Sequence, residues 1–130
     1  MGDVFNYFNK PTEKELEELW NKLKERIVSF LGAEPYIKSG KPSWRNFYVA
    51  EPETKKEPYF AATMIQKRIG KILIIVKYNA NVNDPKGLLK PTTFFGGVKD
   101  RCKEFYISSE DQLDDAIGFI KQSLDIVNMM

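Results

Sequence analysis

The chain has 130 residues, of which 42% are hydrophobic and 29% charged, and this composition is typical of one soluble globular domain that can bury its own core. The 20 basic and 18 acidic residues nearly balance, and histidine is absent, which excludes histidine-dependent nucleophile dyads and histidine-ligated zinc. The one cysteine, Cys102, cannot form an internal disulfide and fits a reducing, cytoplasmic setting. We therefore expect a single domain over residues 1–130, with residues 1–11 as an N-terminal arm.

The first predicted element is a helix that starts near Thr12. Thr12 and Glu15 have the spacing of a capping box, in which each side chain binds the backbone N–H of the other residue. Apolar residues then recur at helical spacing, at Leu16, Leu19, Trp20, Leu23, Ile27 and Leu31. Gly32 follows them, at the position where a helix commonly ends in a left-handed conformation.

Between residues 35 and 107 the hydrophobic period changes to two, which predicts strands. We expect about five strands, at 35–38, 45–50, 59–66, 71–78 and 103–107. Gly70 suits a tight hairpin between the third and the fourth. In 71–78 apolar residues occupy both the odd and the even positions, which indicates a central strand with both faces covered. The stretch 79–97 is rich in Asn, Gly, Pro and Thr, with a predicted turn at 84–87 and a short helical turn near Leu88 and Leu89.

A second amphipathic helix is predicted to close the chain. Ser109 and Gln112 have capping-box spacing, and the apolar residues from Leu113 to Val127 fall on one face. No helix-sized pattern separates consecutive strands, so parallel crossovers are not expected. The sequence therefore predicts an α+β, two-layer fold: a mainly antiparallel sheet with the N- and C-terminal helices packed on one face. This helix–strands–helix order is similar in architecture to frataxin-like folds.

Charge is unevenly distributed along the chain. The net charge is 0 over residues 1–65, +6 over 66–107 and −4 over 108–130. The basic segment could present one patch for phosphate groups, with aromatic side chains for stacking on bases. The candidate cations are Lys67, Arg68, Lys71, Lys99, Arg101 and Lys103, and the candidate stacking residues are Tyr78, Phe94 and Phe95. The alternative is that these cations protect strand edges and keep the protein soluble.

A second candidate anion site is at Trp44 and Arg45. An arginine beside an indole can hold a carboxylate or phosphate with two hydrogen bonds while it stacks on the ring. The alternative interpretation is structural: Trp44 and Phe47 belong to the core, and Arg45 pairs with an acidic residue of a helix.

Enzymatic activity is not expected. Glu53 and Lys55 have the Glu-x-Lys spacing of metal-dependent nucleases, with Asp84 or Asp100 as a further acid, but the pair sits in a charged loop. No glycine-rich phosphate loop or calcium loop is present, so no cofactor and no metal are predicted. The longest aliphatic run, 72–76, is far shorter than the roughly 20 residues that span a bilayer, so no membrane association is expected.

Three short motifs resemble a family of small bacterial and archaeal domains of unknown function. They are Arg45-Asn46-Phe47, 84–88 (Asp-Pro-Lys-Gly-Leu), and 107–110 (Ile-Ser-Ser-Glu) with Leu113-Asp114 at the last helix. Members occur alone, some labelled "predicted transport protein", or at the C-terminus of proteins that look like modification-dependent restriction enzymes. They often carry a glycine- and histidine-rich stretch where this chain has 94–101 without histidine. The resemblance implies a compact accessory domain.

Together these observations predict a non-enzymatic accessory or interaction domain that binds nucleic acid or a nuclease or restriction partner. A protein–protein interaction module that uses the sheet face away from the helices is the first alternative. A metal-dependent, nuclease-like enzyme is the second.

Overall fold

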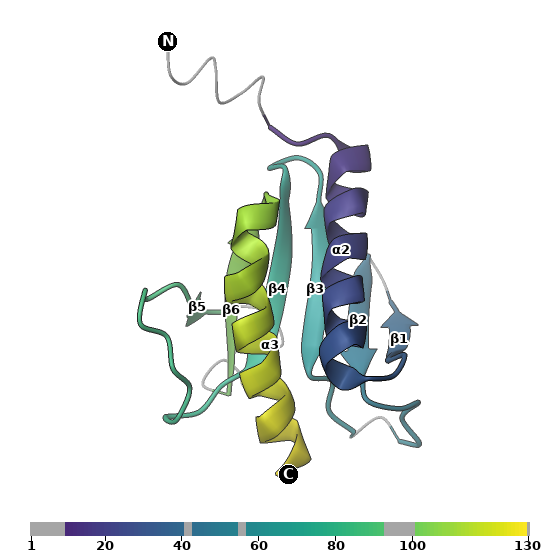
Figure 1. Cartoon of the computed structure of the whole chain (residues 1–130), viewed down its shortest axis with the longest axis vertical. Coiled ribbons are helices and arrows are strands. Elements are labelled where there is room, and N and C mark those ends of the chain that lie inside the picture. The colour runs from purple at the N-terminus through teal and green to yellow at the C-terminus, as the bar shows by residue number, and fades with distance from the viewer. Residues whose placement is uncertain (1–9, 41–42, 55–56, 93–100, 130) are drawn as a thin grey trace.

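The computed structural model describes residues 10–40, 43–54, 57–92 and 101–129. These form the predicted α+β fold, in which an antiparallel sheet of order β1-β2-β3-β4-β6-β5 carries two helices on one face (Figure 1). The helical elements are α2 (Glu13–Leu31), the short 3-10 helix η2 (Glu110–Gln112) and α3 (Leu113–Asn128). The strands are β1 (Tyr36–Ser39), β2 (Trp44–Tyr48), β3 (Ala61–Gln66), β4 (Lys71–Lys77), β5 (Lys90–Pro91) and β6 (Cys102–Ile107).

Both predicted capping boxes are confirmed. The Glu15 backbone N–H donates to the Thr12 hydroxyl at 3.1 Å, and the Thr12 N–H donates back to the Glu15 carboxylate at 3.0 Å. The second box, of Ser109 and Gln112, starts the 3-10 turn that leads into α3. Gly32 ends α2 with a φ of 71°, the left-handed conformation that glycine adopts without strain.

The predicted helical turn near Leu88 and Leu89 is wrong. The turn at 84–87 forms, with the Gly87 N–H donating to the Asp84 carbonyl at 3.1 Å. The Asp84 carboxylate then accepts the N–H groups of both leucines at 2.9 Å, so these donors are held by a side chain in an irregular loop. After this loop the chain enters β5, a sixth strand that the sequence analysis did not predict.

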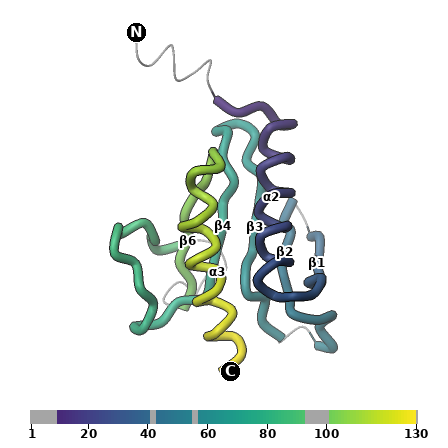
Figure 2. Tube along the Cα trace, in the orientation of Figure 1, coloured from purple at the N-terminus to yellow at the C-terminus, as the bar shows by residue number. Residues whose placement is uncertain are grey.

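The main core lies between the helices and the sheet. Ile72 and Ile74 of β4 are fully buried there against residues of both helices, among them Leu23 of α2 and Ile120 of α3. Figure 2 shows α2 and α3 side by side on this face of the sheet. The ion pairs Lys22–Glu110 and Arg26–Asp114 connect α2 to η2 and α3 across the surface of the helical layer.

A serine hydroxyl joins α3 to the end of the β3–β4 pair. The register of these strands ends at Ala61 opposite Val76. Beyond that point the fully buried Ser123 hydroxyl donates to the Phe60 carbonyl at 2.6 Å and accepts the Lys77 N–H at 2.8 Å. A side chain therefore satisfies two backbone groups next to the end of the strand register.

The β3–β4 hairpin is packed against the segment that precedes α2. Gly70 has a φ of 66°, and a Cβ atom there would lie 2.2 Å from Cγ of Lys10. The Lys10 ammonium donates to the Arg68 carbonyl at 2.7 Å. A glycine is therefore required at this turn by both its backbone conformation and the close approach of Lys10. The rest of the predicted arm, residues 1–9, lies outside the described residues.

Candidate functional site

The sheet face turned away from α2 and α3, which we call the distal face, carries a row of apolar and aromatic side chains. Trp44, Met64, Leu73 and Tyr106 are direct neighbours across four strands in the observed register. Leu73 is fully buried, whereas the other three are partly exposed around it. The row therefore has one aromatic ring at each end, Trp44 and Tyr106, and a packed apolar centre between them.

Lys71 lies next to this row, at the end of the sheet where the hairpin turn connects β3 to β4. Lys71 is exposed, and its ammonium lies 5.7 Å from the centre of the Tyr106 ring. Arg68, at the tip of the same hairpin, is exposed as well. Burial, together with the nearby Glu104 carboxylate, raises the pKa of Tyr106. We call Trp44, Met64, Arg68, Lys71 and Tyr106 the hairpin-end site.

The six candidate cations do not form one patch. Lys77 pairs with Cys102 and Val76 with Lys103, so the entry of β6 lies at the opposite end of β4 from the hairpin. Six residues of strand, or about 20 Å, separate these ends. Arg101 and Lys103 therefore lie far from Lys71, and Lys99 is outside the described residues.

Of the two candidate stacking residues in the described part of the chain, Trp44 lies at the hairpin-end site and Tyr78 does not. Tyr78 lies at the opposite end of β4, where the Lys103 ammonium is 5.0 Å from the centre of its ring. Phe94 and Phe95 lie outside the described residues. Tyr106 is not among the residues predicted from the sequence, although its position in β6, alternating with buried Phe105 and Ile107, places it on the distal face.

Arg45 lies on the helix side of the sheet, as the structural interpretation of the sequence predicted. Its guanidinium donates to both oxygens of Glu17 at 2.7 and 2.9 Å and lies 4.7 Å from the Trp20 ring centre. The hydrogen bonds from Arg45, and then its charge and that of Lys67, hold the pKa of the Glu17 carboxyl below its ordinary value of 4.5. Lys67 itself pairs with Glu13 of α2 at 3.0 Å.

We expect Glu17→Gln to destabilise the fold in a pH-dependent way. Because the folded protein lowers the pKa of Glu17, the stabilising effect is complete above pH 4.5 and is lost as the pH falls through the folded-state pKa. The expected loss at pH about 7 is at most about 1 kcal/mol, since solvent screens this half-exposed pair. Urea unfolding curves from about pH 7 down to about pH 3 measure it.

Glu34→Gln is the matched control, because Glu34 pairs with Lys24 only at 3.9 Å and is well exposed. It should change the free energy of unfolding by less than about 0.5 kcal/mol at every pH. An equal loss in both variants would mean that the Arg45–Glu17 pair adds nothing specific to stability.

The far end of the distal face is closed by a second cation–aromatic contact. The Lys77 ammonium lies 3.9 Å from the centre of the buried Tyr59 ring, and burial lowers the pKa of Lys77. The Tyr59 hydroxyl is 3.8 Å from the Cys102 sulfur, and burial raises the pKa of Tyr59. These groups are packed into the face, so they offer less accessible surface than the hairpin-end site.

The described residues contain no cluster of three or more Cys, Asp or Glu side chains that could hold a metal ion. Glu53 is exposed in the loop after β2, and the Asp84 carboxylate is occupied by the backbone of its own loop. Lys55 and Asp100 lie outside the described residues. Within the described part of the chain, no helix is both long and apolar enough to cross a membrane.

Comparison of the chain with protein-family models, with curated proteins and with solved structures found no match.

Proposed function

We propose that this chain is a non-enzymatic domain that binds single-stranded nucleic acid at the hairpin-end site. The observation that carries the proposal is the row in which Trp44 and Tyr106 flank Met64 and Leu73, with Lys71 beside it. Aromatic side chains on a sheet face stack on unpaired bases, and nearby cations neutralise the phosphates.

The spacing of the two rings suits an extended single strand. Trp44 and Tyr106 lie three strand spacings apart, or about 14 Å. Bases that stack on these rings would be separated by a base over the apolar Met64 and Leu73. Lys71 and Arg68, at the hairpin, would contact the phosphates that connect these bases.

The distribution of charge between the layers supports the same face. The described helical elements α2, η2 and α3 contain ten acidic and five basic residues, whereas the strands contain six basic residues and one acidic residue. Arg45 and Lys103 face the helix side, whereas the other four strand lysines lie on the distal face with the single carboxylate Glu104. A polyanion is therefore repelled by the helical layer and attracted to the distal face. The accessory role beside a nuclease or restriction enzyme, which the family resemblance implies, is compatible with such binding and is part of the proposal.

Fluorescence anisotropy with labelled oligo-dT and oligo-U tests the proposal at about 50 and 200 mM salt. We expect binding that weakens steeply with salt. Lys71→Gln should reduce the slope of log affinity against log salt by about 0.7, the value for one lost phosphate contact on a single strand. Tyr106→Leu should weaken binding about five- to a hundredfold, because stacking contributes about 1–3 kcal/mol per base.

The helical layer offers a matched pair of controls. The Lys121 ammonium lies 5.5 Å from the Phe30 ring centre, which resembles the Lys71–Tyr106 contact in geometry. Lys121→Gln and Phe30→Leu should leave affinity within about twofold, because neither residue lies on the distal face. The absence of binding at 50 mM salt, or equal losses in both pairs, would overturn the proposal.

A further inference from the structure

The outer edge of β6 is exposed beside a groove of about 470 Å³. β5 pairs with Glu104 and Lys103 only. Phe105–Ile107 pair with β4 on their inner side, and no described strand pairs with them on the outer side. In an antiparallel sheet every second residue of such a strand directs its N–H and C=O away from its partner. In the observed register Phe105 and Ile107 direct these groups to β4, so this edge presents the N–H and C=O of Tyr106 to the groove.

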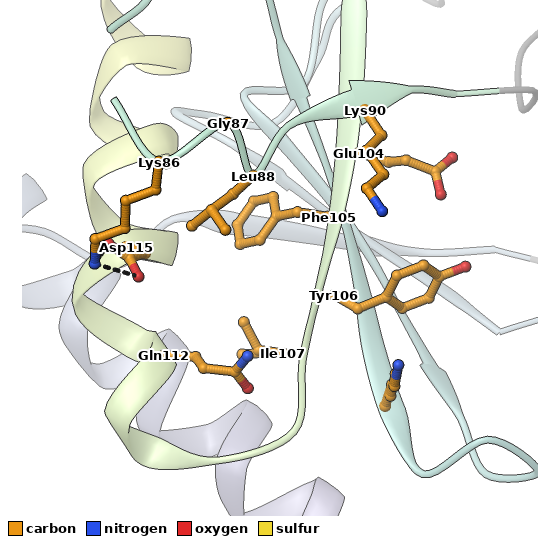
Figure 3. A pocket seen from close by; sticks show the side chains of 11 residues that line it. Lys86, Gly87, Leu88, Lys90, Glu104, Phe105, Tyr106, Ile107, Gln112 and Asp115 are labelled. Atoms are coloured by element: carbon orange, nitrogen blue, oxygen red, sulfur yellow. Dashed lines mark hydrogen bonds and ion pairs between the residues drawn. The ribbon is translucent and has the colours of Figure 1, made fainter. Parts of the chain in front are cut away.

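The Asp84 turn keeps this edge exposed. A longer β5 would place Leu89 and Leu88 opposite Phe105 and Tyr106, in continuation of the observed register. The N–H groups of both leucines are instead held by the Asp84 carboxylate at 2.9 Å. The segment before β5 therefore bends away from β6, and the groove lies between this loop, β6 and the start of α3 (Figure 3).

The two sides of the groove differ in chemistry. Figure 3 shows Leu88, Phe105 and Ile107 turned toward α3, whereas Lys90, Glu104 and Tyr106 lie on the other side of β6. On the first side these three apolar residues join the main core, and Gln112 and the Lys86–Asp115 ion pair border them. On the second side Lys90 and Lys71 outnumber the one carboxylate, Glu104.

We propose that this groove binds an extended segment of a partner protein, which adds to the sheet as a strand along Phe105–Ile107. Side chains alternate along a strand, so the segment would alternate apolar residues, against Leu88 and Phe105, with acidic residues, toward Lys71 and Lys90. A second copy of this chain fits less well, because edge-to-edge pairing of two β6 strands would bring their lysines together.

The probe is a capped peptide of about eight residues that alternates valine and glutamate. Titration into the isotopically labelled protein should shift the backbone amide resonances of Phe105–Ile107 and slow the hydrogen exchange of the outward-facing Tyr106 amide. The same peptide with alternate amides N-methylated should bind about tenfold more weakly, because it loses the N–H that donates to the Tyr106 carbonyl and its methyl groups obstruct pairing at the edge. A peptide that alternates valine and lysine should also bind about tenfold more weakly.

Lys90→Glu is the discriminating variant, because Lys90 lies at the groove but not at the hairpin-end site. It should weaken binding of the glutamate peptide and strengthen binding of the lysine peptide, without reducing affinity for oligo-dT more than about twofold. Equal affinity for the parent and N-methylated peptides, or unchanged resonances at Phe105–Ile107, would overturn the proposal. Self-association in sedimentation that blocks the peptide would identify a second copy as the occupant and would also overturn it.

Discussion

Ser123→Ala should lower the free energy of unfolding by about 2–4 kcal/mol, a large part of the stability of a small domain. The Ser123 hydroxyl binds two backbone groups, the Lys77 N–H at 2.8 Å and the Phe60 carbonyl at 2.6 Å. Ser123 and Phe60 are fully buried, and Lys77 is partly buried. Removing the hydroxyl leaves both groups without that partner, and each unsatisfied buried group costs about 1–3 kcal/mol. Urea unfolding followed by circular dichroism measures the loss.

Ser29→Ala is the matched control for this substitution. Ser29 is exposed on α2, so the same change of side chain removes no buried contact. It should leave stability unchanged or raise it by a few tenths of a kcal/mol, because alanine is the better helix former. A loss below about 1 kcal/mol at Ser123 would show that water or a backbone shift replaces the hydroxyl.

The local features of the fold were predictable from the sequence because their causes are local. Thr12 with Glu15, and Gly32 after the last apolar residue, determine both ends of α2 through hydrogen bonds and backbone conformation within one turn. The hairpin at Gly70 and the central position of β4 follow from turn chemistry and from an apolar pattern on both faces. The two-layer arrangement then follows from the order of the elements.

The combined basic patch could not form in the topology that the sequence predicts. In an antiparallel sheet the start of β6 pairs with the end of β4, so Arg101 and Lys103 are placed away from the hairpin by the same rule that predicts the sheet. The neighbour that Lys71 acquires is Tyr106, from the end of β6. Identifying that neighbour requires the register, which depends on contacts distant in sequence.

β5 was missed for a different reason. Lys90 and Pro91 form only two residue pairs, and a strand this short has no periodicity that could be recognised in the sequence. The hydrogen bonds of the Asp84 carboxylate decide where β5 begins, and the leucines they hold could equally suit a helical turn. The groove beside β6 is a consequence of this local competition for backbone N–H groups.

The distribution of charge along the sequence bears on both proposed binding sites. The basic segment and the acidic C-terminal segment of the sequence become different layers of the fold, with the strands mainly basic and the helical elements mainly acidic. A balanced total charge therefore conceals a molecule with two electrically distinct faces. For this reason, both proposed binding sites use cations of the sheet: Lys71 beside the aromatic row, and Lys90 at the groove.

Thr63→Val should destabilise the fold by about 2 kcal/mol, although it preserves the shape of the side chain. The indole N–H of Trp20 donates to the Thr63 hydroxyl at 2.9 Å, and this hydroxyl donates to the Arg45 carbonyl at 2.7 Å. Trp20 and Thr63 are both buried. Valine removes the acceptor and leaves the indole N–H unsatisfied in the core, a loss that its equal volume cannot offset.

Thr63→Ser distinguishes the contribution of the hydroxyl to stability from the contribution of the methyl group. Serine keeps both hydrogen bonds and loses one buried methyl, so its expected cost is about 1 kcal/mol. Urea unfolding of the two variants should therefore rank serine above valine in stability. The opposite order would show that packing, and not the Trp20–Thr63–Arg45 hydrogen bonds, holds α2 against β2 and β3. Because these bonds lie on the helix side of the sheet, neither variant should change binding at Trp44 and Tyr106 while the protein is folded.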